Sequence, residues 1–347
     1  MPPGSKVRVA LLLPLTGNSA ALGQAMLDAA MMALYDVGAE NVLVMPHDTG
    51  ANPQAAADAA RAAINDGVNL IIGPLLAADV EAVKPVAQQA NVPVIAFSTV
   101  TSLAGNGVYL MGFQPQQEID RIVAYAHSRG ANRFAVFAPR TLYGNLAMSE
   151  MKSATEAVQA SLDIVGEYEP SPTAFADAAK RFAARGKKYD ALLLPEGDGR
   201  LKAMAPLLAY YDVDPDKIHF IGTGLWDDPS LGTEPNLVHG WYAAPPPQAR
   251  AGFERRFRDA EGHASPRLAT LAYDATALAA VLAKNPTGAD FSANTLTNPS
   301  GFAGLDGVFR FQDNGVVQRG LAVLEVQRDG PTVIDPAPES FMTAPSQ

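Results

Sequence analysis

The feature that most constrains the fold of this chain is a regular alternation of short apolar runs with longer alanine-rich segments. From Val7 to Gly130 the apolar runs are rich in leucine or β-branched residues, and each is followed by a stretch of helical composition. Strands of a parallel sheet are buried on both faces, and a crossover, usually a helix, must separate them in sequence. The alternation therefore predicts an α/β fold in which helices cover a parallel sheet. The strands predicted in this half are residues 7–13, 42–46, 70–73 and 92–97.

The same alternation begins again after Gly130 and predicts a second α/β half. Three consecutive prolines, Pro245 to Pro247, then interrupt it, and two helical stretches follow at 250–261 and 267–283. Residues 307–326 alternate around an Asp-Asn-Gly turn and predict an antiparallel hairpin. Since 347 residues exceed one ordinary domain of ~100 to 200 residues, we expect two doubly wound α/β domains. The strands predicted in the second half are residues 133–138, 164–168, 191–195 and 218–222.

The charge balance and the absence of cysteine exclude several classes of protein. There are 36 acidic and 26 basic residues, a formal charge of −10, whereas nucleic-acid-binding proteins normally carry an excess of positive charge. Without cysteine the chain has no disulfides, thiolate zinc sites or iron–sulfur clusters. Its apolar runs are much shorter than the ~20 residues that span a bilayer. The opening, Met1 to Ser5, is consistent with the removal of an upstream signal or anchor segment, and equally with a flexible native terminus.

Catalytic and cofactor-binding motifs are absent from the sequence. It contains no H-E-x-x-H, G-x-S-x-G or Walker A motif, and its five histidines are dispersed without metal-ligand spacing. Gly222 to Asp227 begins like a dinucleotide-binding fingerprint but has aspartate where the third glycine belongs. Glu196 and Asp198 could pair as carboxylates, although acids before a helix more often serve its N-terminus. We therefore predict no catalytic residue, metal or cofactor. Hydrolysis by Glu196 or Asp198 is kept as an alternative to the binding functions given below.

The loops that follow the predicted strands are the candidate binding region, because open α/β sheets bind ligands at the carboxyl ends of their strands. Taken singly, these loop residues are the types that turns and helix caps need. Together they offer hydroxyls, backbone amides at helix starts, a tyrosine and a tryptophan, which suits a small polar or zwitterionic ligand. The candidate ligand-binding residues are Thr16, Leu75, Leu76, Ala77, Ser98, Thr99, Thr101, Ser102, Tyr143, Glu196, Trp226 and Asp227.

Several of these segments carry a resemblance to a known family. The sequence Leu-Leu-Leu-Pro-Leu-Thr-Gly at 11–17 and the Ile-Gly-Pro-Leu-Leu turn at 72–76 resemble the type I periplasmic-binding-protein fold. Within that fold the chain looks most like the penicillin-binding protein activator branch, envelope lipoproteins that are related to leucine-binding proteins. The likeness extends over almost the whole chain, through Tyr143-Gly144 and the Ala-Tyr-Asp-Ala sequence at 272–275.

The resemblance implies two lobes that are discontinuous in sequence and joined by three crossings of the chain. The expected first lobe is residues 6–115 with 245–303, and the second is 116–244 with 304–334. Residues 1–5 and 335–347 are expected to be flexible termini. Lobes of this kind close around a hinge and trap ligand between them.

The resemblance to amino-acid-binding members is partial at the ligand contacts. Those members usually hold the ligand carboxylate with a hydroxyl after the third strand, but Pro74 to Ala78 offer only backbone amides and apolar surface. The loop after the fourth strand keeps its hydroxyls, and Tyr143 matches the family's cleft tyrosine. The acid that pairs the ligand ammonium has no match at Thr223 or Gly224, and Asp227 is the nearest. An unpaired buried ammonium is costly, so a free amino acid needs Asp227 or Glu196 to reach it.

Two functions follow from this resemblance. The first is a non-catalytic envelope protein of the penicillin-binding protein activator type, which binds a cell-wall synthase or a wall-derived small molecule. The alternative is the substrate-binding protein of an ABC importer for branched-chain or other amino acids, with an ABC permease as its partner. Either function implies a periplasmic or cell-envelope location, with a lipid anchor on the full-length precursor. Neither function requires a cofactor.

Overall fold

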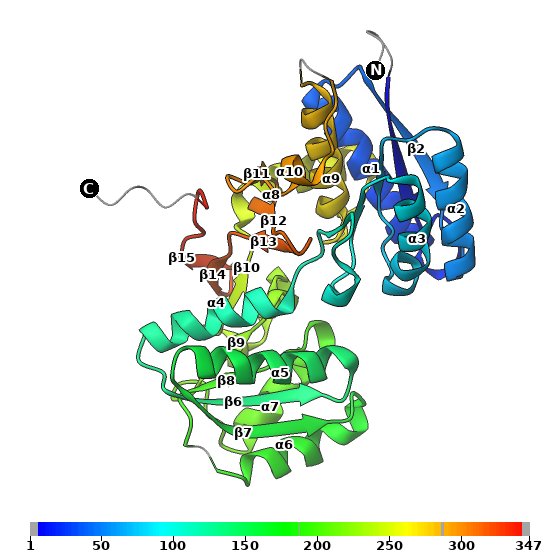
Figure 1. Ribbon diagram of the computed structural model, residues 1–347. Helices are drawn as coiled ribbons and strands as arrows, with labels where there is room; N and C mark the ends of the chain where they lie inside the picture. Colours follow the sequence, from blue (N-terminus) through cyan, green and yellow to red (C-terminus); the bar gives the residue numbers. More distant parts are fainter. Residues whose placement is uncertain (1–5, 187, 286–287, 342–347) are drawn as a thin grey trace. The chain divides into compact units, whose positions relative to one another are not determined.

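A computed structural model describes residues 6–186, 188–285 and 288–341 of the chain (Figure 1). The chain forms two compact units. Unit 1 comprises Met1–Phe113, Pro247–Gly320 and Glu339–Gln347, and unit 2 comprises Gln114–Pro246 and Leu321–Pro338. Of the termini that we expected to be flexible, residues 1–5 and 342–347 lie outside the described residues. Asp335, by contrast, ends a strand, and the Phe341 ring lies 4.7 Å from the Arg310 guanidinium.

Unit 1 contains a parallel sheet of five strands in the order β2-β1-β3-β4-β5. The strands are β1 (Val7–Leu13), β2 (Val42–Asp48), β3 (Leu70–Ile72), β4 (Val94–Ala96) and β5 (Val108–Leu110). The helices are α1 (Ala20–Val37), α2 (Pro53–Asn65), α3 (Ala77–Ala90), α8 (Pro247–Glu261), α9 (Ala269–Ala283) and α10 (Ala293–Leu296). The sequence predicted the first four of these strands but not β5, although β5 is as long as β3 and β4.

Each face of the unit 1 sheet is covered by its own set of helices. Val9 and Leu11 of β1 pack with α1 and α9, whereas Ala10 and Leu12, one residue on, pack with α2 and α3. Successive side chains of a strand point to opposite faces, so a continuous apolar run is what a sheet covered on both faces requires. This explains why the sequence pattern predicted the fold class.

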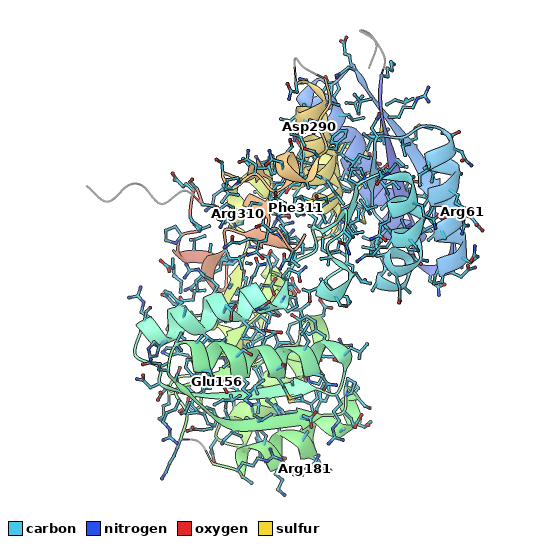
Figure 2. All side chains as sticks on the ribbon, in the orientation of Figure 1. Arg61, Glu156, Arg181, Asp290, Arg310 and Phe311 are labelled. Carbon is cyan, nitrogen blue, oxygen red and sulfur yellow. The ribbon has the colours of Figure 1, made fainter. Side chains whose placement is uncertain are left out.

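A second, antiparallel sheet in unit 1 changes the predicted boundary between the lobes. It consists of β11 (Phe302–Gly304), β12 (Gly307–Phe311) and β13 (Val317–Arg319). Figure 2 labels Arg310 and Phe311 on β12; Phe311 is buried, and its ring centre lies 5.3 Å from that of Tyr109. Residues 304–320 thus belong to unit 1, not to the second lobe as predicted, because their aromatic side chains complete the unit 1 core.

Unit 2 contains a sheet of seven strands in the order β15-β14-β10-β9-β8-β6-β7. The strands are β6 (Arg133–Pro139), β7 (Ser161–Tyr168), β8 (Ala191–Leu193), β9 (His219–Gly222), β10 (Trp241–Ala244), β14 (Ala322–Glu325) and β15 (Thr332–Asp335). All neighbours are parallel except β14, which is antiparallel to β10 and to β15. The predicted hairpin over 307–326 is therefore only half right: β12 pairs with β13, but the residues after Gly320 pair with β10.

The helices of unit 2 also form two layers. They are α4 (Pro115–Ser128), α5 (Leu142–Ala157), α6 (Phe175–Ala183) and α7 (Asp198–Tyr210). Helices α4 and α5 pack on one face of the sheet, and α6 and α7 on the other (Figure 1). Figure 2 labels Arg61, Glu156 and Arg181, which are exposed residues of α2, α5 and α6. Short 3-10 helices complete the chain at Gly17–Ser19, Thr101–Leu103, Pro172–Ala174, Gly224–Trp226, Pro229–Thr233 and Pro235–Leu237.

Each unit contains a close approach between the end of a strand and the helix that follows it. A Cβ at Gly23 of α1 would lie 2.1 Å from the Pro14 carbonyl oxygen, and one at Gly144 of α5 would lie 1.9 Å from that of Pro139. Glycine is needed at both positions because the helix meets backbone there.

Among the described helices, none has the length and apolar character needed to cross a membrane.

Candidate functional site

The loops after β6, β8 and β9 lie along one edge of the unit 2 sheet, because these strands are parallel neighbours. We call this edge the unit 2 carboxyl edge. The strand order reverses between β6 and β8, and ligands of open α/β sheets bind at such a reversal. Tyr143 stands in the first turn of α5, whose N-cap Thr141 accepts a hydrogen bond from the Gly144 N–H at 3.0 Å. The cap fixes the start of the helix and therefore the position of Tyr143.

Tyr143 and Glu118 both contact the loop after β9. The Tyr143 hydroxyl donates to Thr223 Oγ1 at 2.8 Å, and Glu118 Oε2 accepts from the Gly224 N–H at 2.8 Å. Thr223 and Glu118 are buried. A Cβ at Gly224 would lie 2.5 Å from Glu118 Oε1, so a side chain there would collide with the carboxylate. Helices α4 and α5 thus hold the Thr223-Gly224 turn through a carboxylate and a phenol.

Glu118 is a residue that sequence reasoning missed. In the sequence it is an acid in the first turn of a helix, where acids are common because they favour the helix dipole. Its contact with Gly224 joins residues 106 positions apart, and no spacing pattern reports such a contact. The resemblance pointed to an acid in the loop after β9, and the structure places Glu118 of α4 against that loop.

Glu196, which the sequence did predict, lies in the loop between β8 and α7. It is buried, and its Oε1 accepts from the Gly197 N–H at 3.1 Å and from Arg200 at 3.0 Å. Its Oε2 accepts from the Tyr168 hydroxyl at 3.3 Å. Asp198, the other member of the possible pair, is exposed at the start of α7. The structure therefore gives Glu196 a helix-start role and does not bury the two acids together.

The electrostatics of the unit 2 carboxyl edge are acidic. Burial raises the pKa of the Tyr143 phenol strongly, and the negative charges of Glu118 and Glu196 raise it further. Burial and Glu196 likewise raise the pKa of Tyr168. Both phenols therefore stay protonated and act as hydrogen-bond donors. The carboxylates of Glu118 and of Glu196, the latter paired with Arg200, make this edge suitable for a ligand group that is positively charged or donates hydrogen bonds.

Trp226 does not line a ligand surface as predicted. Its side chain is 1% exposed, packs in the unit 2 core, and donates its indole N–H to the Leu194 carbonyl oxygen at 3.0 Å. A Cβ at Gly222 would lie 2.2 Å from the indole ring, so the backbone is packed directly on it. The prediction was wrong because a tryptophan in a loop after a strand was expected to expose its ring to a ligand. Asp227, its neighbour, is half-buried, and its backbone N–H donates to the Gly224 carbonyl at 3.1 Å.

The predicted residues of unit 1 follow β1, β3 and β4, which are parallel neighbours, so they share the unit 1 carboxyl edge. Thr16 donates its hydroxyl to Asp48 Oδ2 at 2.6 Å. Asp48 also accepts from the Leu15 and Gly50 backbone N–H groups. Although burial opposes ionisation, hydrogen bonds from Thr16 and these amides lower the pKa of Asp48. Asp48, the charged last residue of β2, therefore holds the loop that follows β1.

The remaining unit 1 candidates divide into apolar and hydroxyl groups. Leu75 is half-buried, Leu76 is the N-cap of α3 with its side chain 49% exposed, and Ala77 begins the helix. Ser98 is buried and accepts from the Val100 N–H at 3.1 Å. The exposed hydroxyls of this loop are those of Thr99, Thr101 and Ser102. The start of α3 thus offers free backbone amides and the next loop offers hydroxyls, which together suit an anionic ligand group.

Within residues 6–186, 188–285 and 288–341, no group of three or more His, Cys, Asp or Glu side chains is arranged to hold a metal ion. The binding chemistry available at the two carboxyl edges is therefore that of hydroxyls, amides and carboxylates.

Comparisons with known proteins agree with this fold. The family described as "Periplasmic binding protein" matches residues 6–331 of the chain. The structure is also similar to that of a protein from Rhodospirillum rubrum described as a putative branched-chain amino acid ABC transporter. The TM-score is 0.83 at 18% identity, over 95% of this chain and 100% of that one.

Two further solved structures carry ligands in their descriptions. One is the branched-chain amino acid transporter substrate binding protein LivJ from Streptococcus pneumoniae, in complex with isoleucine. Its TM-score is 0.69 at 17% identity, over 96% of this chain and 100% of that chain. The other is a solute binding protein of an ABC transporter from Rhodopseudomonas palustris, in complex with 3,4-dihydroxybenzoic acid. Its TM-score is 0.72 at 20% identity, over 98% of this chain and 99% of that chain.

A curated protein with a similar sequence is an uncharacterized protein of Rickettsia prowazekii. It is 22% identical over 178 residues, which is 51% of this chain. The match spans about half, 47%, of that relative's own length.

Proposed function

The chain belongs to the periplasmic binding protein family, and we propose that it is a non-catalytic receptor that binds a small solute for an ABC importer. Membership implies a periplasmic location, and the family consists of binding proteins. Relatives of the same fold are described as ABC transporter proteins, with isoleucine bound in one case and 3,4-dihydroxybenzoate in another. These relatives support the class of function, and the ligand must be argued from the residues of this chain.

The observation that carries the proposal is the position of Glu118 beside Tyr143 and Thr223. An ammonium group that loses its water needs a carboxylate partner, because an unpaired buried charge costs several kcal/mol. Glu118 comes from α4 and contacts the turn after β9, where the amino-acid-binding relatives were expected to place their acid. We therefore propose that the ligand carries a primary amine, as amino acids do, and that Glu118 faces it.

The unit 1 carboxyl edge, taken by itself, suits an anionic ligand group. Backbone amides at the start of α3, at Leu76 and Ala77, and the hydroxyls from Ser98 to Ser102 are donors. A helix N-terminus attracts negative charge because its first amides lack partners within the helix. A branched-chain amino acid carries such an anionic group together with the amine proposed for Glu118, whereas a simple carboxylate lacks the amine.

A thermal unfolding screen tests the proposal. The wild-type protein would be heated with isoleucine, with its amine-free analogue 3-methylpentanoate, and with a panel of other amino acids. A ligand at 100 times its dissociation constant stabilises the folded state by ~2.7 kcal/mol. We expect stabilisation by at least one amino acid and none by the amine-free acid. Stabilisation by neither an amino acid nor any other amine would sink the proposal.

Two variants locate the binding. Glu118→Gln keeps an oxygen that accepts from the Gly224 N–H but loses the charge, and should weaken binding of the amine at least tenfold, ~1.4 kcal/mol. Glu156→Gln makes the same change at an exposed residue of α5 and should leave binding unchanged. Equal affinities in the two variants would remove Glu118 from the site.

The second candidate is the penicillin-binding protein activator type, with an envelope lipid anchor upstream of this chain. The loop from Pro74 to Ala78 favours it, because it lacks the hydroxyl with which amino-acid receptors hold a carboxylate. Trp226, which lies in the core, also leaves one expected ligand contact unfilled. Cross-linking in native envelopes distinguishes the two candidates: recovery of a cell-wall synthase favours the activator, and recovery of a permease favours the receptor.

A further inference from the structure

An open pocket of about 410 Å³ lies between α1 and the end of α8 in unit 1, apart from the carboxyl edge. Five of its lining residues lie on one face of α1, at positions i, i+3, i+4, i+7 and i+8, and two come from α8. The lining residues are Asp28, Met31, Met32, Tyr35, Asp36, Arg256 and Glu261.

The apolar part of the pocket is unusually accessible. Met31 is 49% exposed and Tyr35 is 88% exposed, although both stand on a helix whose other face is deeply buried. Met32 is half-buried beside the aromatic cluster of Phe253 and Phe257. Methionine adapts its shape to different partners, and tyrosine offers a large ring with little conformational entropy to lose. Exposed side chains of these types are typical of a binding surface.

The polar part of the pocket is acidic. Its lining includes three carboxylates and one guanidinium, and that guanidinium is already engaged: Arg256 donates to Asp36 at 2.7 Å, and Tyr273 donates to the same carboxylate at 2.6 Å. Asp28 accepts from Gln24 at 2.8 Å, and Glu261 makes no hydrogen bond or ion pair with any residue that the structure describes. Two carboxylates on the rim are therefore left without a cation.

We propose that this pocket is a docking site for an arginine or lysine side chain, flanked by apolar residues, on a protein partner. The cation pairs with Asp28 and Glu261, its aliphatic stem lies on Met31, and the Tyr35 ring gives a cation–π contact. A second copy of this chain does not fit, because a symmetric contact would bring the same carboxylates together on a chain that already carries a formal charge of −10. This proposal is independent of the solute that the receptor binds.

The test uses protein labelled with ¹³C at its methionine methyl groups and two peptides. The probe is acetyl-Leu-Arg-Leu-amide, and the control peptide replaces arginine by citrulline, which has the same shape without the charge. We expect the arginine peptide to shift the Met31 and Met32 methyl signals saturably, more weakly as salt is raised, and the citrulline peptide to bind at least about threefold more weakly.

Matched variants exclude a general charge effect. The double substitution Asp28→Asn with Glu261→Gln should weaken the arginine peptide about three- to tenfold, and Tyr35→Ser should weaken it as well. Glu81→Gln with Asp177→Asn removes the same charge from exposed helix positions elsewhere and should leave binding unchanged. Four results would each overturn the proposal: equal binding of both peptides, equal loss in both double variants, no shift at Met31 and Met32, or shifts that depend on protein concentration without peptide.

Discussion

The Asp306 backbone N–H donates to Asp274 Oδ2 at 3.4 Å, and this contact brings two fully buried carboxyl groups together in unit 1. Burial raises the pKa of Asp274 to about 7, and the charge of Asp306 adds to the effect. Burial opposes the ionisation of Asp306 too, but Arg267 and Arg319 outweigh it and lower its pKa. One carboxyl therefore stays ionised while the other takes up a proton near neutral pH.

The first prediction is that stability falls as pH rises through the range in which Asp274 loses its proton. Its pKa in the folded protein, about 7, exceeds the ordinary value of 3.8, so the folded state binds the proton more tightly. The stabilising contribution is fully present below pH 3.8 and is lost as the pH passes about 7. The slope from this group approaches ~1.4 kcal/mol per pH unit between these values.

Urea unfolding of the wild type and of Asp274→Asn at several pH values measures this effect. The variant should lose the slope, because an amide does not titrate, while its oxygen still accepts from the Leu305 N–H. Asp177→Asn, at an exposed residue of α6, serves as the control and should keep the wild-type slope. Parallel curves for the wild type and Asp274→Asn would show that Asp274 does not change its protonation in this range.

The second prediction concerns the hydrogen bond between Tyr143 and Thr223. Tyr143→Phe removes the donor and leaves the buried Thr223 hydroxyl without it, which should lower the free energy of unfolding by ~1 kcal/mol. Tyr210→Phe makes the same change at a side chain that is 77% exposed and should have little effect. Denaturant unfolding of both variants gives the comparison, and equal stabilities would contradict the role given to the phenol.

The third prediction tests the contacts between helix and strand end. Gly144→Ala places a methyl group 1.9 Å from the Pro139 carbonyl oxygen, so we expect destabilisation by ~1 to 3 kcal/mol as the backbone moves apart. Gly252→Ala, in α8, meets nothing within 4 Å and should stabilise the protein by ~0.5 to 1 kcal/mol. Thermal unfolding should separate the two variants in opposite directions, and the same sign for both would refute the steric argument.

The fourth prediction tests the core position of Trp226. Trp226→Phe removes buried volume and leaves the Leu194 carbonyl without the indole donor, so it should cost more than 1 kcal/mol, within the ~1 to 3 kcal/mol range of such losses. Trp241→Phe loses an indole bond to Glu325 at a half-exposed residue and should cost less. If Trp226→Phe were neutral to stability but abolished ligand binding, the side chain would act at the ligand and not in the core.

Most strands of the five-stranded and seven-stranded sheets could be predicted from the apolar runs of the sequence. The run from Val7 to Leu13 matches β1 residue for residue, because a strand buried on both faces is apolar throughout. The sequence did not predict β5, and it misplaced residues 304–320, whose unit depends on which core the side chains of Phe309 and Phe311 complete.

The candidate site was predictable only in part. Tyr143 and the hydroxyls after β4 were selected because each follows a strand and strand order places such loops on one edge of their own sheet; their role at a ligand stays a prediction. Glu118 was missed, because its contact with Gly224 joins two elements that are distant in sequence. Trp226 was misassigned, because the same loop position can face solvent or core and composition does not distinguish them.

The sequence by itself determined the alternation of strands and helices, since the period of apolar residues is a local property that each segment carries. Only the tertiary structure decided which ionisable groups meet. Glu118 faces Tyr143 and Asp274 faces Asp306, and the chemistry of each pair depends on distance through space and on the water that burial removes. Neither quantity is encoded in spacing along the chain.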